Sequence, residues 1–216
     1  MSEESTLITR EHFRYLAERT PLDDAFLKSL KQAAKDEGIP TIWVAPEQAS
    51  FMQILLKLQG ARHVVEVGTL AGYSAIIMAR ALADGGTVRT IEIEAKHADF
   101  AERWIARSDV AGKVKVHRGA GLDVLPAFAA ASADAAFLDA DKPSYPGYLR
   151  ECLRIVRPGG LIMADNAFAF GELFSEHPTQ ESVSAVRRFN DVIASEKALH
   201  SVIVPIGDGL WVGVKR

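Results

Sequence analysis

Residues 63–92, HVVEVGTLAGYSAIIMARALADGGTVRTIE, are the stretch that decides the fold of this chain. Residues 63–67 form a short and mostly apolar run, which is typical of a parallel strand covered on both faces. A glycine-containing loop then leads into an apolar helix pattern over 73–83, which the Asp-Gly-Gly turn at 84–86 ends. Residues 87–92 form a second strand pattern. A strand, a helix and another strand in this order predict a right-handed βαβ unit.

The same alternation continues through the rest of the chain. Further strands are expected at 113–117, 133–138 and 161–164, and helices at 95–106, 122–131, 145–156 and 179–195. Two final strand patterns, 200–205 and 210–214, flank an Asp-Gly pair, which favours an antiparallel hairpin. The sequence therefore predicts an α/β fold with a seven-stranded, doubly wound sheet, helices on both faces and the last strand antiparallel.

The first 45 residues are expected to form a helical extension of a single domain whose core spans 46–216. Two helices are expected within 8–37, the second capped by Thr20 with Pro21 in its first position. A third helix is expected from Pro46 to Leu58, and its apolar face is predicted from helical spacing. The residues of that face are Phe51, Ile54, Leu55 and Leu58.

Composition excludes several classes of function. The 25 basic and 28 acidic residues form no basic block, which argues against nucleic-acid binding. No apolar run approaches the ~20 residues that span a bilayer, and the polar start MSEESTLITREHF has no signal-peptide core. The single cysteine, Cys152, fits a buried helix position and cannot form an internal disulfide. A cytoplasmic protein without a membrane or nucleic-acid partner is expected.

A cofactor is expected at the carboxyl ends of the strands, where open α/β sheets bind ligands. Gly68 and Gly72 allow the backbone to approach a ligand closely, although a plain strand-to-helix turn would also use them. Their G-x-x-x-G spacing serves a nicotinamide pyrophosphate poorly. Glu92, at the end of the next strand, can accept hydrogen bonds from ribose hydroxyls. Glu66 would repel a phosphate and suit an ammonium group, so these residues favour S-adenosylmethionine.

Oxygen-bearing side chains follow two other strands. Asp139 ends the strand at 133–138, and Asp165 and Asn166 end the strand at 161–164, so the three are expected to converge. Carboxylate and amide oxygens suit Mg²⁺ best, with Mn²⁺ or Ca²⁺ as alternatives, and do not suit zinc. Lys142, three residues after Asp139, is either a general base toward a hydroxyl or a surface charge.

These motifs together resemble the cation-dependent O-methyltransferase family that includes the caffeoyl-CoA and catechol O-methyltransferases. VEVGTLAGYS at 65–74 is similar to the family's first cofactor motif. FLDADKPSYPGYL at 137–149 and MADN at 163–166 are similar to its metal and catalytic segments. RRFN at 187–190 and PIGDGLWVGVKR at 205–216 resemble its last helix and strands. The resemblance runs from about Val44 to the C-terminus.

The resemblance implies a Rossmann-like class I methyltransferase fold and assigns roles to particular residues. Asp139, Asp165 and Asn166 would hold a divalent cation, and Lys142, with Asp139, would be catalytic by removing the proton of the acceptor hydroxyl. The residues implied to bind S-adenosylmethionine are Glu66, Gly68, Tyr73, Ser74, Glu92, Gly121, Asp139 and Asp141. The resemblance further implies a small acceptor with neighbouring oxygens, such as a catechol, and a homodimer.

The sequence departs from the family at two places. Val44 stands where plant members carry threonine, and Ala169 stands where an aromatic often packs on the acceptor, although Phe168 and Phe170 flank it. These departures leave the shape of the acceptor open. Three alternatives also stay open: a nicotinamide-dependent oxidoreductase, a non-catalytic S-adenosylmethionine-binding relative, and methyl transfer to an amine or carboxyl group.

Overall fold

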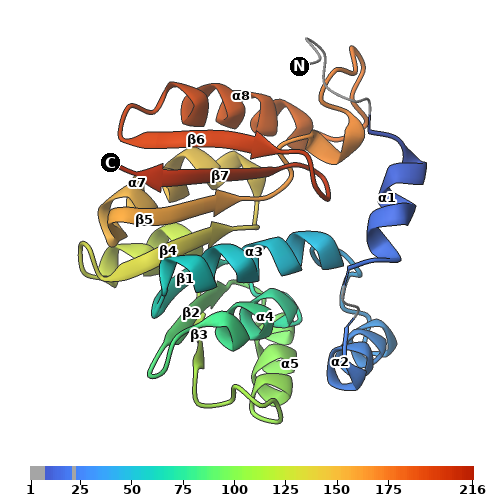
Figure 1. Cartoon of the computed structure of the whole chain (residues 1–216), viewed down its shortest axis with the longest axis vertical. Helices are drawn as coiled ribbons and strands as arrows, with labels where there is room; N and C mark the ends of the chain where they lie inside the picture. The colour runs from blue at the N-terminus through green and yellow to red at the C-terminus, as the bar shows by residue number, and fades with distance from the viewer. Residues whose placement is uncertain (1–7, 21–22) are drawn as a thin grey trace.

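A seven-stranded sheet runs through the centre of the molecule in this computed structural model, which describes residues 8–20 and 23–216 (Figure 1). Its strands are β1 (His63–Val67), β2 (Thr87–Glu92), β3 (Val114–Arg118), β4 (Ala133–Leu138), β5 (Val156–Ala164), β6 (Leu199–Val204) and β7 (Leu210–Lys215). They lie in the order β3-β2-β1-β4-β5-β7-β6. The order reverses between β1 and β4, which is where doubly wound sheets bind ligands.

The predicted strand directions are confirmed. The first five strands pair in parallel, and β7 pairs antiparallel with both β5 and β6. The hairpin predicted at the Asp-Gly pair therefore forms the last two strands at one edge of the sheet. It also places the turn between β6 and β7 at the carboxyl end of β5, beside the residues predicted to hold a metal ion.

Helices cover both faces of the sheet (Figure 1). One face packs against α3 (Pro46–Gln59), α4 (Tyr73–Ala81) and α5 (Ala95–Ile105). The other packs against α6 (Gly121–Val124), α7 (Tyr145–Ile155) and α8 (Ser182–Ser195). Three short 3-10 helices are η1 (Leu125–Ala127), η2 (Lys142–Ser144) and η3 (Ala169–Gly171). Cys152 is buried in α7, as expected.

Several predicted boundaries are wrong. The helix expected over 122–131 is only the four residues of α6 followed by η1, because Pro126 cannot continue an α-helical hydrogen-bond ladder. Strand β5 begins at Val156, directly after α7, so the expected turn at 157–160 lies within the strand. Helix α8 begins at Ser182 rather than Thr179.

The buried face of α3 overlaps the predicted one only in part, because Phe51 and Leu55 pack against the core and the other two predicted residues do not. Ile54 and Leu58 are 54% and 82% exposed, whereas Met52 and Leu56 are fully buried, together with Gln48 and Ala49. The helix carries apolar residues on two sides, so spacing alone did not select between them. Contact with α4 and the sheet selects the face that begins at Gln48.

Two helices precede this core, α1 (Arg10–Ala17) and α2 (Ala25–Asp36). The side chain of Asp24 caps α2 by accepting a hydrogen bond from the Leu27 backbone N–H at 2.8 Å. The helix therefore begins at Ala25, and Thr20 is not its cap; Pro21 lies outside the described residues. Both helices lie on the side of the carboxyl ends of the parallel strands (Figure 1). Among the described helices, none has the length and hydropathy to cross a membrane.

Candidate active site

A cavity of about 1010 Å³ opens at the carboxyl ends of the parallel strands. It is lined by every site residue predicted from the sequence except Glu66: Gly68, Tyr73, Ser74, Glu92, Gly121, Asp139, Asp141, Lys142, Asp165 and Asn166. These residues come from segments nearly 100 positions apart in the chain. Parallel strands bring them together because each strand ends at the same edge of the sheet.

Gly68 is required by the packing of the sheet itself. Its φ is +101°, and a Cβ atom at this position would lie 1.9 Å from the backbone oxygen of Asp139. The loop after β1 therefore packs directly on the first residue after β4. Any side chain at Gly68 would push the proposed cofactor loop away from the proposed metal ligand.

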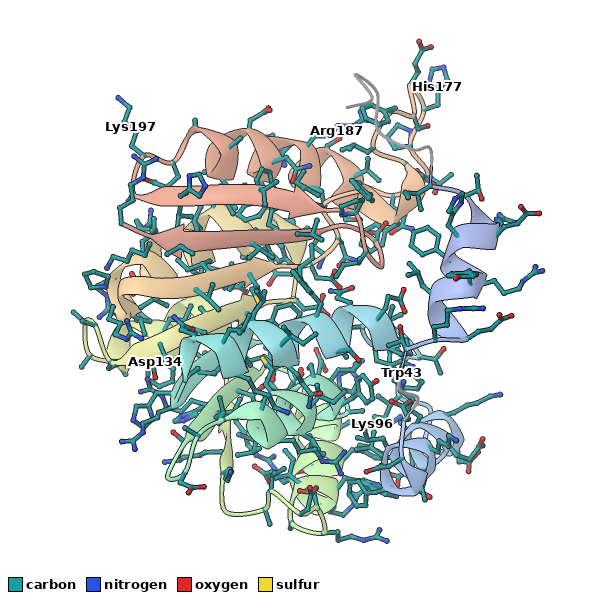
Figure 2. The ribbon with its side chains drawn as sticks, viewed as in Figure 1. Trp43, Lys96, Asp134, His177, Arg187 and Lys197 are labelled. Carbon is teal, nitrogen blue, oxygen red and sulfur yellow. The ribbon has the colours of Figure 1, made fainter. Side chains whose placement is uncertain are left out.

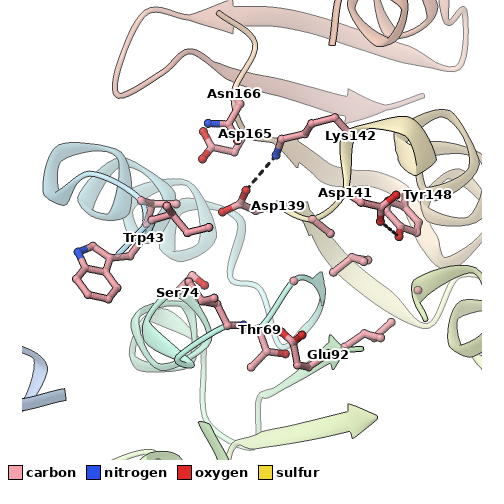
Figure 3. Close-up of a pocket in the computed structure, with 18 of the residues that line it drawn as sticks. Trp43, Thr69, Ser74, Glu92, Asp139, Asp141, Lys142, Tyr148, Asp165 and Asn166 are labelled. Atoms are coloured by element: carbon pink, nitrogen blue, oxygen red, sulfur yellow. Dashed lines mark hydrogen bonds and ion pairs between the residues drawn. The ribbon is translucent and has the colours of Figure 1, made fainter. Parts of the chain in front are cut away.

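Glu92 is fixed by two backbone groups. Its Oε2 accepts a hydrogen bond from Leu70 N–H at 2.7 Å, and its Oε1 accepts one from Glu94 N–H at 2.9 Å. Each carboxylate oxygen retains a further lone pair for a ligand hydroxyl. The side chain is buried at the cavity wall, beside the loop that begins at Gly68 (Figure 3). This geometry suits the recognition of a ribose.

Glu66 does not line the cavity, which differs from its expected place beside the cofactor. It is fully buried, and neither carboxylate oxygen accepts a hydrogen bond of ordinary length and angle from residues 8–20 and 23–216. Burial raises the pKa of Glu66 to about 8, and the nearby hydroxyls of Ser74 and Thr90 lower it only in part. Ser74 lies between Glu66 and the cavity, so any influence of Glu66 on a ligand passes through its neighbours.

Four side chains meet at the other end of the cavity. Asp139 follows β4, and Asp165 and Asn166 follow β5, so all three project from adjacent strands (Figure 3). Lys142 is buried, and its Nζ lies 3.2 Å from Asp139 Oδ1. Two carboxylates and an amide on one cavity wall are a donor set suited to a hard divalent cation.

The two carboxylates at this end interact unfavourably with each other. Burial and the charge of Asp139 raise the pKa of Asp165, while Gln48 and Lys142 offset this only in part. Asp165 is buried and Asp139 is partly exposed, and Lys142 compensates their charge only in part. A further positive charge at this position would relieve the remaining repulsion.

Tyr145 holds Lys142 from the side opposite the cavity. Lys142 Nζ donates to the Tyr145 hydroxyl at 2.5 Å, and this hydroxyl donates in turn to the Leu138 backbone oxygen at 3.1 Å. Burial raises the pKa of Tyr145 well above its ordinary value, so the hydroxyl keeps its proton. Because that proton faces Leu138, Tyr145 accepts a hydrogen bond from the lysine and fixes the position of its Nζ.

Asp141 lines the cavity and also makes two local contacts. It caps η2, and it accepts a hydrogen bond from the Tyr148 hydroxyl at 2.5 Å. Gly121 lies against the same tyrosine, because a Cβ on Gly121 would come within 2.6 Å of Tyr148 Cε1. Tyr148 also lines the cavity, so it joins Asp141 and Gly121 in one wall.

Tyr73 links the N-terminal helices to the cavity. Its hydroxyl donates to Asp23 Oδ1 at 2.7 Å, and Lys31 Nζ lies 3.9 Å above its ring and 2.7 Å from Asp23 Oδ2. Lys31 also lies 5.4 Å from the centre of the Trp43 ring. This cluster fixes α2 against the start of α4 and places Trp43 in the cavity wall.

Sequence reasoning missed four residues of this site: Gln48, Tyr145, Tyr148 and Asp208. The tyrosines had a usable signal, because Lys142, Tyr145 and Tyr148 follow one another at three-residue intervals, which places them on one face of a helical segment. No sequence signal indicated Gln48 or Asp208, since each contacts its partner only in the tertiary fold. Phe170 lines the cavity beside the buried Ala169, so an aromatic is present next to the position where the family often carries one.

The model of the O-methyltransferase family matches residues 17–216. The chain belongs to this family. It is 40% identical over 197 residues to a catechol O-methyltransferase of Niastella koreensis, across 90% of this chain and 86% of that protein. It is therefore an S-adenosylmethionine-dependent O-methyltransferase, and the nicotinamide-dependent alternative is wrong.

Solved structures of similar proteins agree with this assignment to the O-methyltransferase family. An O-methyltransferase from Bacillus cereus, in complex with S-adenosylhomocysteine, superposes with a TM-score of 0.85 at 33% identity, over 94% of this chain and 96% of that one. An O-methyltransferase of Streptomyces achromogenes involved in tomaymycin synthesis, in complex with S-adenosylmethionine, gives a TM-score of 0.83 at 30% identity, over 97% and 99%. The Rossmann-like methyltransferase fold is confirmed.

Proposed function

We propose that this O-methyltransferase requires a divalent cation, with Mg²⁺ preferred, and methylates one hydroxyl of a small phenol that carries two neighbouring oxygens, such as a catechol. The observation that supports this is the meeting of Asp139, Asp165, Asn166 and Lys142 on one wall of the cavity that also contains the Gly68 loop and Glu92. The catechol O-methyltransferase of Niastella koreensis is a relative whose name agrees with such an acceptor.

The residues at each end of the cavity have distinct roles in this proposal. S-adenosylmethionine supplies an electrophilic methyl group when bound, and Gly68, Ser74, Glu92, Gly121 and Asp141 would hold it, with Glu92 on the ribose. Asp139, Asp165 and Asn166 would hold the cation, which lowers the pKa of a coordinated hydroxyl. Glu66 would act on the cofactor through Ser74, and Tyr73 would support the wall of the cavity.

Lys142 would accept the proton of the acceptor hydroxyl. Its contacts with Asp139 and Tyr145 hold its Nζ at the edge of the proposed metal site, where it could take up that proton. The apolar side chains of Trp43 and Phe170 line the same cavity and would exclude water from the reacting atoms. Most of the rate enhancement would then come from positioning and from charge stabilisation.

Methyl transfer from labelled S-adenosylmethionine tests the proposal. The acceptors are a panel of catechols, each paired with the phenol that lacks the second hydroxyl, and each is assayed with Mg²⁺ and with EDTA. We expect transfer to the catechols alone, abolished by EDTA. Transfer that survives EDTA would overturn the cation requirement and favour an amine or carboxyl acceptor. Equal transfer to the single-hydroxyl phenols would overturn the need for neighbouring oxygens.

We further propose a homodimer in the cytoplasm as the working state of the enzyme. The exposed apolar side chains of Ile54 and Leu58 on α3 support association, and the single buried cysteine is compatible with a reducing compartment. Light scattering of the purified chain tests the first point. A monomer at micromolar concentration would overturn it.

A further inference from the structure

The turn between β6 and β7 contacts the segment that carries two proposed metal ligands. This turn spans residues 205–209 and contains Asp208. The Asp208 carboxylate accepts a hydrogen bond from Asn166 Nδ2 at 3.1 Å and another from the Phe170 backbone N–H at 2.8 Å. The backbone oxygens of Asp208 and Gly209 accept from Phe168 and Ala167, both at 2.9 Å.

The segment held in this way has an unfavourable backbone conformation. Asn166, Ala169 and Phe170 have φ values of +63°, +53° and +60°, although none of them is glycine. Such residues persist only where surrounding contacts over-determine them, and they concentrate at functional sites. Four hydrogen bonds from one turn to residues 166–170 are contacts of this kind.

The contact with Asp208 also decides which atom of Asn166 faces the cavity. A carboxylate can only accept hydrogen bonds, so the amide nitrogen of Asn166 must point toward Asp208. The amide oxygen, which is the only atom of that group able to ligate a cation, is thereby turned away from the carboxylate. Without Asp208 the amide could rotate and present its nitrogen to the metal site.

The same turn supports the second ligand through Gln48. Gln48 is buried on α3, and its Nε2 donates to Asp165 Oδ1 at 2.8 Å. Gly207 packs against this side chain so closely that an added Cβ would lie 2.2 Å from Gln48 Oε1. Gln48 therefore cannot rotate toward the turn. One oxygen of Asp165 is occupied by Gln48, and the other remains for a cation.

We infer that Asp208 is a positioning residue of the cation site, which orients the amide oxygen of Asn166 toward the metal. This inference rests on the proposed cation dependence. Groups that hold metal ligands typically contribute 10–100-fold to metal affinity. The role is one of geometry and not of charge alone, so an uncharged side chain with the same acceptor oxygen should preserve it.

Binding of Mn²⁺ to the full chain, without cofactor or acceptor, tests this inference by the electron paramagnetic resonance signal of free Mn²⁺. We expect Asp208→Ala to weaken Mn²⁺ binding at least about tenfold. Asp208→Asn should bind close to the parent chain, because its amide oxygen can accept the same two hydrogen bonds. The affinity for S-adenosylmethionine, measured on the same samples, should stay unchanged in both variants.

Asp134→Ala provides a matched control. Asp134 accepts hydrogen bonds from the backbone of Arg62 and His63 and from Arg157, but it lies at the start of β4, at the opposite end of the sheet (Figure 2). Its loss should lower stability without weakening Mn²⁺ binding, which separates a general loss of stability from a loss at the metal site.

Four results would overturn the inference. Unchanged Mn²⁺ affinity in Asp208→Ala would show that the turn does not position a ligand. Equal weakening in Asp208→Asn and Asp208→Ala would show that the charge acts and the geometry does not. A matching fall in Mn²⁺ affinity in Asp134→Ala would show that the weaker binding in Asp208→Ala comes from a general loss of stability. Failure of the parent chain itself to bind Mn²⁺ would overturn the cation site as well, which distinguishes the two proposals.

Discussion

Glu66 places an ionisable carboxyl group inside the sheet, between Thr90 on β2 and Phe137 on β4. Burial of this carboxyl is costly because the hydroxyls of Ser74 and Thr90 compensate it only in part, and the cost falls mainly on the charged form. An ammonium group bound beside Ser74 would favour the charged form of Glu66.

Glu66 should make the free energy of unfolding depend on pH. Its pKa in the folded chain is about 8, against an ordinary value of 4.5, so folding binds a proton between these pH values. Stability therefore falls as pH rises through this window, by about 1.4 kcal/mol per pH unit. We expect Glu66→Gln to remove this contribution, to be more stable than the parent at pH 8, and to bind S-adenosylmethionine more weakly.

Urea unfolding of the parent and Glu66→Gln at pH 5, 6.5 and 8 measures this difference. Subtracting one curve from the other removes the contribution of every other titrating group, including Asp165. Parallel curves for the two proteins would contradict the prediction.

Asp139 is the residue on which the proposed cation site and the proposed base both depend, since it is one of the proposed ligands and contacts Lys142. Asp139→Asn should lower kcat by at least about 100-fold, the size of a general-base contribution, with little change in the unfolding midpoint. Steady-state kinetics on a catechol, with thermal unfolding as the control for folding, checks this expectation. Full turnover that Mg²⁺ still stimulates would remove Asp139 from the mechanism.

Among the elements, α3 shows most clearly how the tertiary structure selects one face of a helix. Leu56 and Leu58 are two positions apart on the same helix, yet one is fully buried and the other is 82% exposed. The buried face carries Gln48 at the same time, so the packing of α3 and the geometry of the metal site depend on one choice of face.

The pair Leu56→Ala and Leu58→Ala tests this arrangement with identical chemistry. Leu56→Ala should destabilise the fold by about 2–5 kcal/mol through a buried cavity, whereas Leu58→Ala should leave the fold of the single chain within about 0.5 kcal/mol of the parent. Chemical denaturation at several protein concentrations measures both and separates a loss of dimer association from a loss within the fold. A larger loss for Leu58→Ala that does not depend on protein concentration would mean that the predicted face, and not the observed one, is buried.

For the whole molecule, the cavity is lined by residues from both halves of the sheet and by residues 42–45, between α2 and α3, so a ligand in it contacts distant parts of the chain. Because only the folded chain has this cavity, S-adenosylmethionine at 100 times its dissociation constant should add about 2.7 kcal/mol to the free energy of unfolding. Thermal unfolding with increasing ligand measures the effect. Glu92→Gln should need more ligand for the same shift, and an unchanged requirement would take Glu92 out of the cofactor site.

The sequence by itself determined the class of fold, the strands β1, β2 and β4 to the residue, the antiparallel hairpin and ten of the residues that line the cavity. It could do so because these features depend on local patterns: apolar runs that become buried strands, glycines at turns, and polar residues directly after a strand, which the topology of a parallel sheet brings to one edge.

The tertiary structure alone decided the face that α3 buries, the start of α2, the burial of Glu66 outside the cavity, and the roles of Gln48 and Asp208. Gln48 and Asp165 are 117 residues apart, and Asn166 and Asp208 are 42 apart. No local pattern encodes such pairs, because the free energy that orients these side chains comes from partners that meet only after the strands have assembled into the sheet.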